Sequence, residues 1–235
     1  LTSVCQREEE KTMIFRNKKA NLAEGLAKYE KEPPGYKKRT RTVSETASRY
    51  VYDKEENCYR NTEVRSENTA RLMCVGDLMC EEKMYKAYNF DDKFLPYGIF
   101  YYVKKVFAEA DFVIGNLETT ICEEAPYTGE EYKINGKYHC NAPASYLDIL
   151  KYAGFDMFAL SNNHNLDCGA LGIGETIEEV EKRKFLHTGL YTDPNEKDRY
   201  VVVNINGIKV AFLSYSTWFN RNLNRLTEKG QGLLN

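Results

Sequence analysis

The stretch DMFALSNNHNLDCG, residues 156–169, contains a short apolar run that ends in a group of polar residues before a glycine. An apolar run of this length, bounded by turn-forming residues, predicts a buried β-strand. The asparagines and the glycine favour a turn after it. The same turn brings Asn162, Asn163, His164 and Asp167 together, and these residue types can bind a metal or a phosphate. The stretch therefore predicts a strand whose carboxyl end carries either a simple turn or a site.

The same pattern of an apolar run with a polar end occurs twice upstream. RLMCVGD (71–77) ends in Gly-Asp, and DFVIGNLE (111–118) ends in Gly-Asn-Leu-Glu. Helical patterns follow in SYLDILKYAGF (145–155), which Gly154 is suited to end, and in the charged GETIEEVEKRKF (174–185). Strands that alternate with helices predict an α/β fold with a mostly parallel sheet.

A β-hairpin is predicted at the end of this alternation. The segment RYVVVNINGIKVAFLSYST, residues 199–217, consists of two apolar runs joined by Asn206-Gly207. Asn-Gly is the strongest short signal for a two-residue hairpin turn, because both positions need a positive φ.

Three polar clusters fall at the predicted carboxyl ends of the strands, which is where open α/β sheets bind ligands. Their side chains are Asp77, Asn116, Glu118, Asn163 and His164. Carboxylates, amide oxygens and an imidazole suit Mn²⁺, Mg²⁺, Fe²⁺ or Zn²⁺. Such an ion could polarise a phosphoryl oxygen, and an adjacent histidine could protonate a leaving group. Each residue also has a simpler interpretation as a helix cap, a solvated loop acid, a turn residue or a hydrogen-bonded loop histidine.

Composition restricts the classes of partner and compartment. The formal net charge of −2 does not indicate nucleic acid or an anionic membrane surface as a partner. No apolar run approaches the roughly 20 residues of a membrane helix, and no secretory signal is visible. The seven cysteines are scattered and odd in number, so a disulfide framework is not expected and a cytoplasmic location is favoured.

Residues 1–70 differ in character from residues 71–235. They contain fifteen Lys and Arg against twelve Asp and Glu, and few large aliphatic residues. One short helix is predicted over residues 21–31, ended by Pro33 and Pro34. The basic run KKRTRT, residues 37–42, could bind nucleic acid, but no binding motif accompanies it, so a solvated tether is favoured. We expect an N-terminal charged extension, partly helical or irregular, followed by one domain.

Five motifs resemble the CapA family of capsule synthesis proteins, also called the poly-γ-glutamate biosynthesis family. They are VGDLM (75–79), IGNLETT (114–120), SNNHNLDCG (161–169), HTGLY (187–191) and VAFLSYS (210–216). The family is related to the calcineurin-like metallophosphatases. The resemblance therefore implies a layered α/β/β/α fold with two divalent metal ions at the strand ends.

The resemblance also implies roles for individual residues. Asp77 matches the acid of the first strand, a metal ligand. Asn116 stands where metallophosphatases have a metal-bridging acid, so Glu118 is the better candidate for that charge. Asn163 and His164 match a pair in which asparagine binds metal and histidine contacts the substrate or acts as an acid.

Asp167 would orient His164, and Thr119 and His187 are secondary candidates. Further histidines of the family, in a Gly-His-His-Pro-His stretch, are not found before Asn235. We therefore expect a domain that is incomplete at its C-terminus.

Two functions remain open. One is a metal-dependent phosphoesterase-like or hydrolase-like enzyme acting on an anionic polymer or a phosphate ester. The other is a polymer-handling or assembly protein without catalysis, working with other capsule-synthesis proteins at the membrane or cell surface. A structural zinc site made by His139, Cys140, His164 and Cys168 is a weaker idea, because their spacing matches no standard zinc motif.

Overall fold

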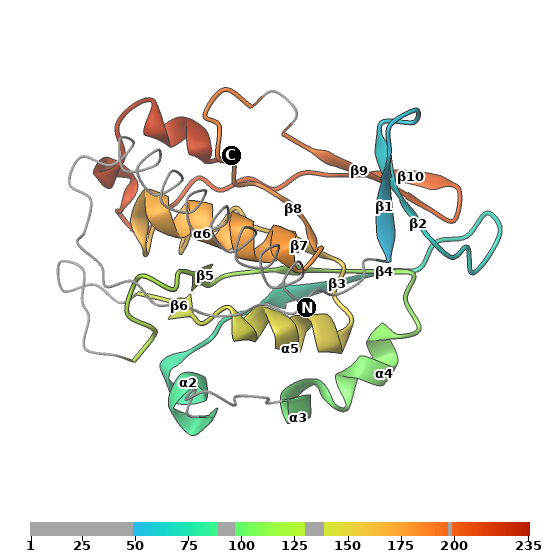
Figure 1. Ribbon diagram of the computed structural model, residues 1–235, viewed down its shortest axis with the longest axis horizontal. Helices are drawn as coiled ribbons and strands as arrows, with labels where there is room; N and C mark the ends of the chain where they lie inside the picture. The colour runs from blue at the N-terminus through green and yellow to red at the C-terminus, as the bar shows by residue number, and fades with distance from the viewer. Residues whose placement is uncertain (1–48, 89–96, 130–138, 197–198) are drawn as a thin grey trace, which may run out of the picture.

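The computed structural model describes residues 49–88, 97–129, 139–196 and 199–235 (Figure 1). The helix expected over residues 21–31 and the basic run 37–42 lie outside the described residues.

A four-stranded parallel sheet forms the centre of the described chain (Figure 1). Its strands lie in the order β3 (Leu72–Asp77), β4 (Phe112–Asn116), β7 (Met157–Ala159) and β8 (Leu186–Thr188). Three of them are the strands predicted from the sequence. All four run in the same direction, so their carboxyl ends meet at one edge of the sheet.

Helices connect these strands. They are α2 (Glu82–Tyr88), α3 (Tyr97–Phe100), α4 (Val103–Phe107), α5 (Ser145–Ala153) and α6 (Gly169–Lys182). Short elements complete this part of the chain: β5 (Thr120–Ile121) pairs in parallel with β6 (Asn141–Ala142), and the 3₁₀ helices are η2 (Leu223–Arg225) and η3 (Gly230–Leu233). Helix α6 begins at Gly169, before the helix that the charged segment 174–185 predicted. It buries the side chains of Glu175 and Glu179. Glu179 forms ion pairs with Lys182 and Arg183, which compensate for the burial of its charge.

A second sheet has the order β1 (Tyr50–Asp53), β2 (Cys58–Asn61), β9 (Val201–Ile205) and β10 (Ile208–Phe212). The predicted hairpin β9–β10 is confirmed: Asn206 and Gly207 have φ values of 53° and 91°. The hairpin β1–β2 was not predicted. It falls within the expected extension, yet β2 pairs in parallel with β9. Residues 50–61 are therefore part of a sheet and not irregular.

Alternate side chains of the parallel sheet enter two different cores. Phe112 of β4 and Met157 of β7 pack with Val203 and other residues of the second sheet. Val113 and Phe158, the next residue on each strand, pack on the other face against the buried side chains of α5 and α6. Successive strand residues point to opposite faces, which explains the division. The described residues thus provide a helical layer and two stacked sheets, consistent with a metallophosphatase-like α/β fold.

Candidate functional site

The turn after β7 is held by its own asparagines. The Asn162 Oδ1 atom accepts a hydrogen bond from the His164 backbone N–H at 3.0 Å. The Asn165 Oδ1 atom accepts one from the Asn162 N–H at 2.6 Å. Asparagine favours turns because its short side chain can bond to nearby backbone in this way. The turn then leads into α6 at Gly169, whose φ of 65° suits glycine.

His164 and Asp167 form a close pair on this turn. The His164 Nδ1 atom lies 2.7 Å from the Asp167 Oδ2 atom. Asp167 is 1% exposed, and its Oδ2 atom also accepts a hydrogen bond from the Cys140 N–H at 2.6 Å. This second bond fixes the carboxylate, which in turn orients the imidazole ring. The other ring nitrogen, Nε2, lies 3.9 Å from the Glu118 Oε1 atom.

Two carboxylates from neighbouring strands meet beside this pair. The Asn116 Nδ2 atom donates to the Asp77 Oδ1 atom at 2.9 Å and to the Glu118 Oε2 atom at 3.1 Å. The Asn162 Nδ2 atom donates to the Asn116 Oδ1 atom at 3.1 Å and to the Leu117 carbonyl oxygen at 2.9 Å. One amide network therefore connects the ends of β3, β4 and β7. We call Asp77, Asn116, Glu118, Asn162, His164 and Asp167 the strand-end cluster.

The cluster changes the acidity of two of its members. Burial raises the pKa of Glu118 above its ordinary value, and the hydrogen-bonded, charged Asp77 carboxyl raises it further. Burial alone would lower the pKa of His164, but the hydrogen bond to Asp167 and the Asp167 charge outweigh it and raise the pKa. Both shifts favour a proton on the group, which suits a donor more than a base.

Three predicted site residues contact partners outside the strand-end cluster. The Asn163 Nδ2 atom donates to the Asn220 Oδ1 atom at 3.3 Å. The His187 Nε2 atom lies 3.3 Å from the Glu181 Oε1 atom. Thr119 is buried, and its Oγ1 atom accepts from the Cys140 thiol at 3.1 Å.

Two residues that support the turn were not among the predicted ligands. Asn162 was predicted as part of the polar group that could form a turn or a site, and it connects β4 to His164. The Arg225 Nη1 atom donates to the Leu166 carbonyl oxygen at 2.8 Å. An arginine in a short 3₁₀ helix such as η2 carries no sequence signal for such a contact. The adjacent asparagines Asn162 and Asn163 did carry a sequence signal, because both were candidate site residues. Only the direction in which each side chain points was unknown.

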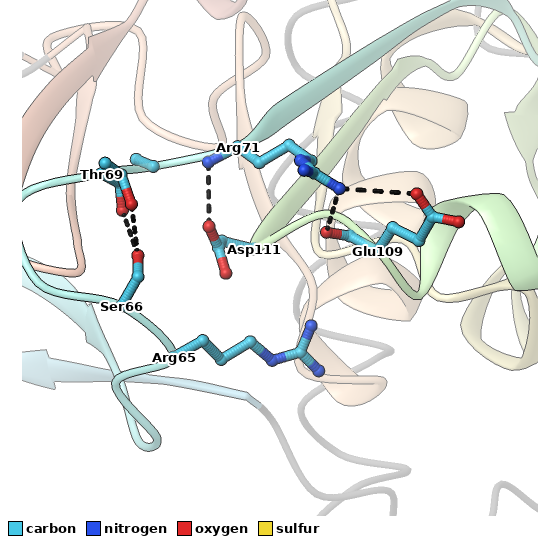
Figure 2. A pocket seen from close by; sticks show the side chains of 7 residues that line it. Arg65, Ser66, Thr69, Arg71, Glu109 and Asp111 are labelled. Atoms are coloured by element: carbon cyan, nitrogen blue, oxygen red, sulfur yellow. Dashed lines mark hydrogen bonds and ion pairs between the residues drawn. The ribbon is translucent and has the colours of Figure 1, made fainter.

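A hollow of about 630 Å³ lies at the opposite edge of the sheet, before β3 and β4 begin. Figure 2 shows the Arg71 side chain directed toward Glu109, its backbone N–H bonded to Asp111, and Ser66 bonded to Thr69. Charges of both signs line it, and they contact one another: the Arg71 Nη1 atom lies 3.4 Å from the Glu109 Oε2 atom. Because active sites of parallel sheets lie at the carboxyl edge, we assign the site to the strand-end cluster and not to this hollow.

The strand-end cluster fits a divalent ion only in part. Within residues 49–88, 97–129, 139–196 and 199–235, no group of three or more His, Cys, Asp and Glu side chains could hold a metal ion. This also removes support for the zinc site of His139, Cys140, His164 and Cys168. The carboxylates of Asp77 and Glu118 do suit a hard cation. Two neighbouring carboxylates repel each other when both are charged, and a bound cation would offset this repulsion.

The fold and the cluster define an α/β protein with a polar site at the carboxyl ends of its parallel strands. The sequence model of the family described as "Bacterial capsule synthesis protein PGA_cap" matches residues 71–232, and the chain belongs to this family. The part of the chain that the structure describes contains no helix that is both long and apolar enough to span a membrane.

Named relatives agree with the family. The chain is 27% identical over 158 residues to "Capsule biosynthesis protein CapA" of Bacillus anthracis, covering 66% of this chain and 36% of the relative. It is 26% identical over 155 residues to "PGA biosynthesis protein CapA" of Bacillus subtilis (strain 168), covering 64% and 38%. An uncharacterized protein of Sinorhizobium fredii, y4sH, is 31% identical over 111 residues, covering 47% and 24%. The match thus spans little more than a third of each CapA relative.

Proposed function

We propose that the strand-end cluster is a metal-dependent hydrolase site, phosphoesterase-like in its chemistry, within a capsule-biosynthesis protein. The observation that carries the proposal is the His164–Asp167 pair, with its Nδ1–Oδ2 distance of 2.7 Å and with the His164 Nε2 atom 3.9 Å from the Glu118 Oε1 atom. A buried carboxylate that orients a histidine is a common arrangement for proton transfer. The substrate would be a phosphate ester or an anionic polymer of the type that the relatives' names indicate.

Mg²⁺ or Mn²⁺ fits the donors better than Zn²⁺. Mg²⁺ is commonly bound by one or two carboxylates and completed by water and substrate oxygens, so it needs no closed cage of protein ligands. Asp77 and Glu118 would hold it, while Asn116 would have to turn its amide to offer an oxygen. When bound, the ion would polarise the scissile group and lower the pKa of a water molecule.

The roles of the protein groups follow from their positions. His164 would donate a proton from Nε2 to the leaving group. Asp167 would hold the ring in the required orientation and stabilise its protonated form. Asn162 would keep the turn against β4, because it bonds both to Asn116 and to the His164 N–H.

A non-catalytic role is the second candidate. It is favoured by the lack of a three-residue metal group within the part of the chain that the structure describes. In this role the cluster would bind an anionic polymer, or a cation carried by it, and other capsule-synthesis proteins would perform the chemistry. The protein would work either in the cytoplasm or at the cell surface.

Hydrolysis assays of the longest natural chain that contains these residues would decide between the two. We expect chromogenic phosphate esters or γ-glutamyl peptides to be hydrolysed in Mg²⁺ or Mn²⁺ and not in chelator. His164→Gln should lower kcat by about 10²–10⁴-fold, the usual contribution of a general acid. His187→Gln is the matched control, since that ring contacts Glu181 and not the cluster. Equal loss in both variants, or no metal-dependent turnover of either substrate, would reject the enzyme and favour the binding role.

A further inference from the structure

Two cysteines lie in contact immediately beside the strand-end cluster. Cys122 follows β5, and Cys168 is the residue before α6, next to Asp167. Both are fully buried, at 0% exposure, and pack in one small cluster with Ala125. Two buried cysteines that pack in one such cluster are candidates for a disulfide, since the bond needs the two side chains close together.

The surroundings hold each cysteine in place. Asn141 fixes Cys122 on both sides: its Oδ1 atom accepts from the Cys122 N–H at 2.8 Å, and its Nδ2 atom donates to the Cys122 carbonyl oxygen at 2.8 Å. Cys168 lies against Thr120, with 3.2 Å between Sγ and Oγ1. It also lies against α6, where a Cβ atom on Gly172 would come within 2.5 Å of the Cys168 Cβ atom. Both cysteines are therefore held by their neighbours within the same small buried cluster.

We propose that Cys122 and Cys168 form a disulfide bond under oxidising conditions, and that this bond fastens the His164–Asp167 turn to strand β5. The oxidant would be a small disulfide. The thiolate of one cysteine attacks it, forms a mixed disulfide and releases one small thiol. The second cysteine's thiolate then attacks the protein-bound sulfur, forms the Sγ–Sγ bond and releases the second small thiol. Each protein thiol loses one proton, and the small disulfide takes up two electrons.

The disulfide bond would affect the strand-end cluster through Asp167. Asp167 precedes Cys168 directly, so a covalent link at Cys168 limits how far the Asp167 carboxylate can move away from His164. Burial and the neighbouring thiol raise the pKa of the Cys122 thiol well above its ordinary value, so exchange in the folded protein is slow at neutral pH. We expect the bond to form while the chain folds, before the thiols are buried.

Refolding in a glutathione redox buffer tests this directly. The reduced, unfolded chain is refolded at pH 8 with glutathione disulfide and glutathione, and its free thiols are blocked. It is then digested without reduction and analysed by mass spectrometry. We expect a linked peptide pair that contains Cys122 and Cys168. The midpoint of thermal unfolding should rise by about 5–10 °C relative to the reduced protein.

Cys122→Ser and Cys168→Ser should each abolish this rise, with Cys122→Ala and Cys168→Ala as second variants if a buried hydroxyl prevents folding. Cys74→Ser is the control, because Cys74 is exposed on β3 and should not affect the rise. Free thiols at Cys122 and Cys168 in the folded, oxidised protein would overturn the proposal, as would a link from either one to Cys80 or Cys140. None of these results depends on whether the protein is an enzyme.

Discussion

His164 connects the chemistry of the site to the stability of the protein. Its pKa in the folded protein lies above the ordinary value of 6.5, because Asp167 outweighs burial. A group with a raised folded-state pKa stabilises the fold fully below its unfolded pKa, and this contribution is lost as the pH rises through the folded pKa. In metal-free protein, the free energy of unfolding should therefore fall as the pH rises from about 6.5 upward.

Denaturant unfolding at a series of pH values measures this fall. His164→Gln should flatten the profile above pH 6.5, since the titrating group is gone. His187→Gln, on the same sheet but outside the cluster, should keep the slope of the parent chain. If both variants keep it, the Asp167 contact does not raise the pKa of His164.

Trp218 offers a direct optical report on the site. It is the one tryptophan of the chain, and its indole N–H donates to the Asn220 Oδ1 atom at 3.1 Å. The same oxygen accepts from the Asn163 amide at 3.3 Å. If Asn163 turns toward a bound cation, as the family resemblance implies, it must leave Asn220, and the environment of the indole changes.

A Mg²⁺ titration of Trp218 fluorescence should then show a saturable shift of the emission. Asn163→Ala should remove the shift, because no amide remains to move. The Asp77→Asn variant should weaken the binding that drives it. An emission spectrum that is unchanged by Mg²⁺ in the parent chain would mean that Asn163 stays with Asn220 and is not a ligand.

The adjacent asparagines show what could be predicted for single residues. The sequence predicted that Asp77, Glu118 and His164 lie close together, because each follows an apolar run and parallel strands bring such ends to one edge of the sheet. Which of Asn162 and Asn163 faces the cluster depends on partners far away in the chain, Asn116 and Asn220. A local pattern contains no information on those contacts.

At the scale of elements, Gly154 ends α5 through its conformation. Its φ is 106°, and its N–H donates to the carbonyl oxygens of Leu150 and Lys151 at 3.2 and 3.1 Å. A Cβ atom there would meet only Phe107, at 3.9 Å, so the cost of a side chain is conformational and not steric.

Gly154→Ala should destabilise the protein by about 1 kcal/mol and lower the midpoint of thermal unfolding by about 2–4 °C. Gly76→Ala is the matched control, since a Cβ atom at Gly76 would meet nothing within 4 Å. We expect the control to change stability by less than about 0.5 kcal/mol. Equal effects of the two substitutions would contradict this account of the helix end.

The hairpins β9–β10 and β1–β2 show why some elements were predicted from the sequence and others were not. Asn206-Gly207 marked β9–β10 because the turn type demands those residues. The strands YVYD and CYRN of β1 and β2 are short and carry charges, so they have little hydrophobic periodicity. Their place is fixed by β9, and the Asn61 side chain bonds to Asn206, 145 residues away. Such a pairing can be recognised only in three dimensions.

At the scale of the whole molecule, the segment around β1 and β2 joins the two sheets. Arg49 forms two contacts with Asp156 at the start of β7, at 2.8 and 2.5 Å, and the Asp156 side chain is only 5% exposed. Tyr50 is buried between the sheets, with its ring 5.0 Å from that of Phe112. The family match begins at residue 71, but the contacts of Arg49, Tyr50 and β2 make residues 49–61 part of the same physical unit.

Truncation tests where this unit begins. A chain that starts at residue 62 loses β1, β2 and the Arg49–Asp156 pair, so β9 has an open edge and Asp156 a buried charge without its cation. We expect its free energy of unfolding to fall by about 1–3 kcal/mol, less than for a fully buried ion pair, because Arg49 is 39% exposed. A chain that starts at residue 49 keeps every contact named here and is the reference for this comparison. Arg49→Met in the full chain separates the ion pair from the hairpin and should give part of the loss. Equal stability of all these chains would place the boundary after residue 61, because the hairpin would then add nothing to the fold.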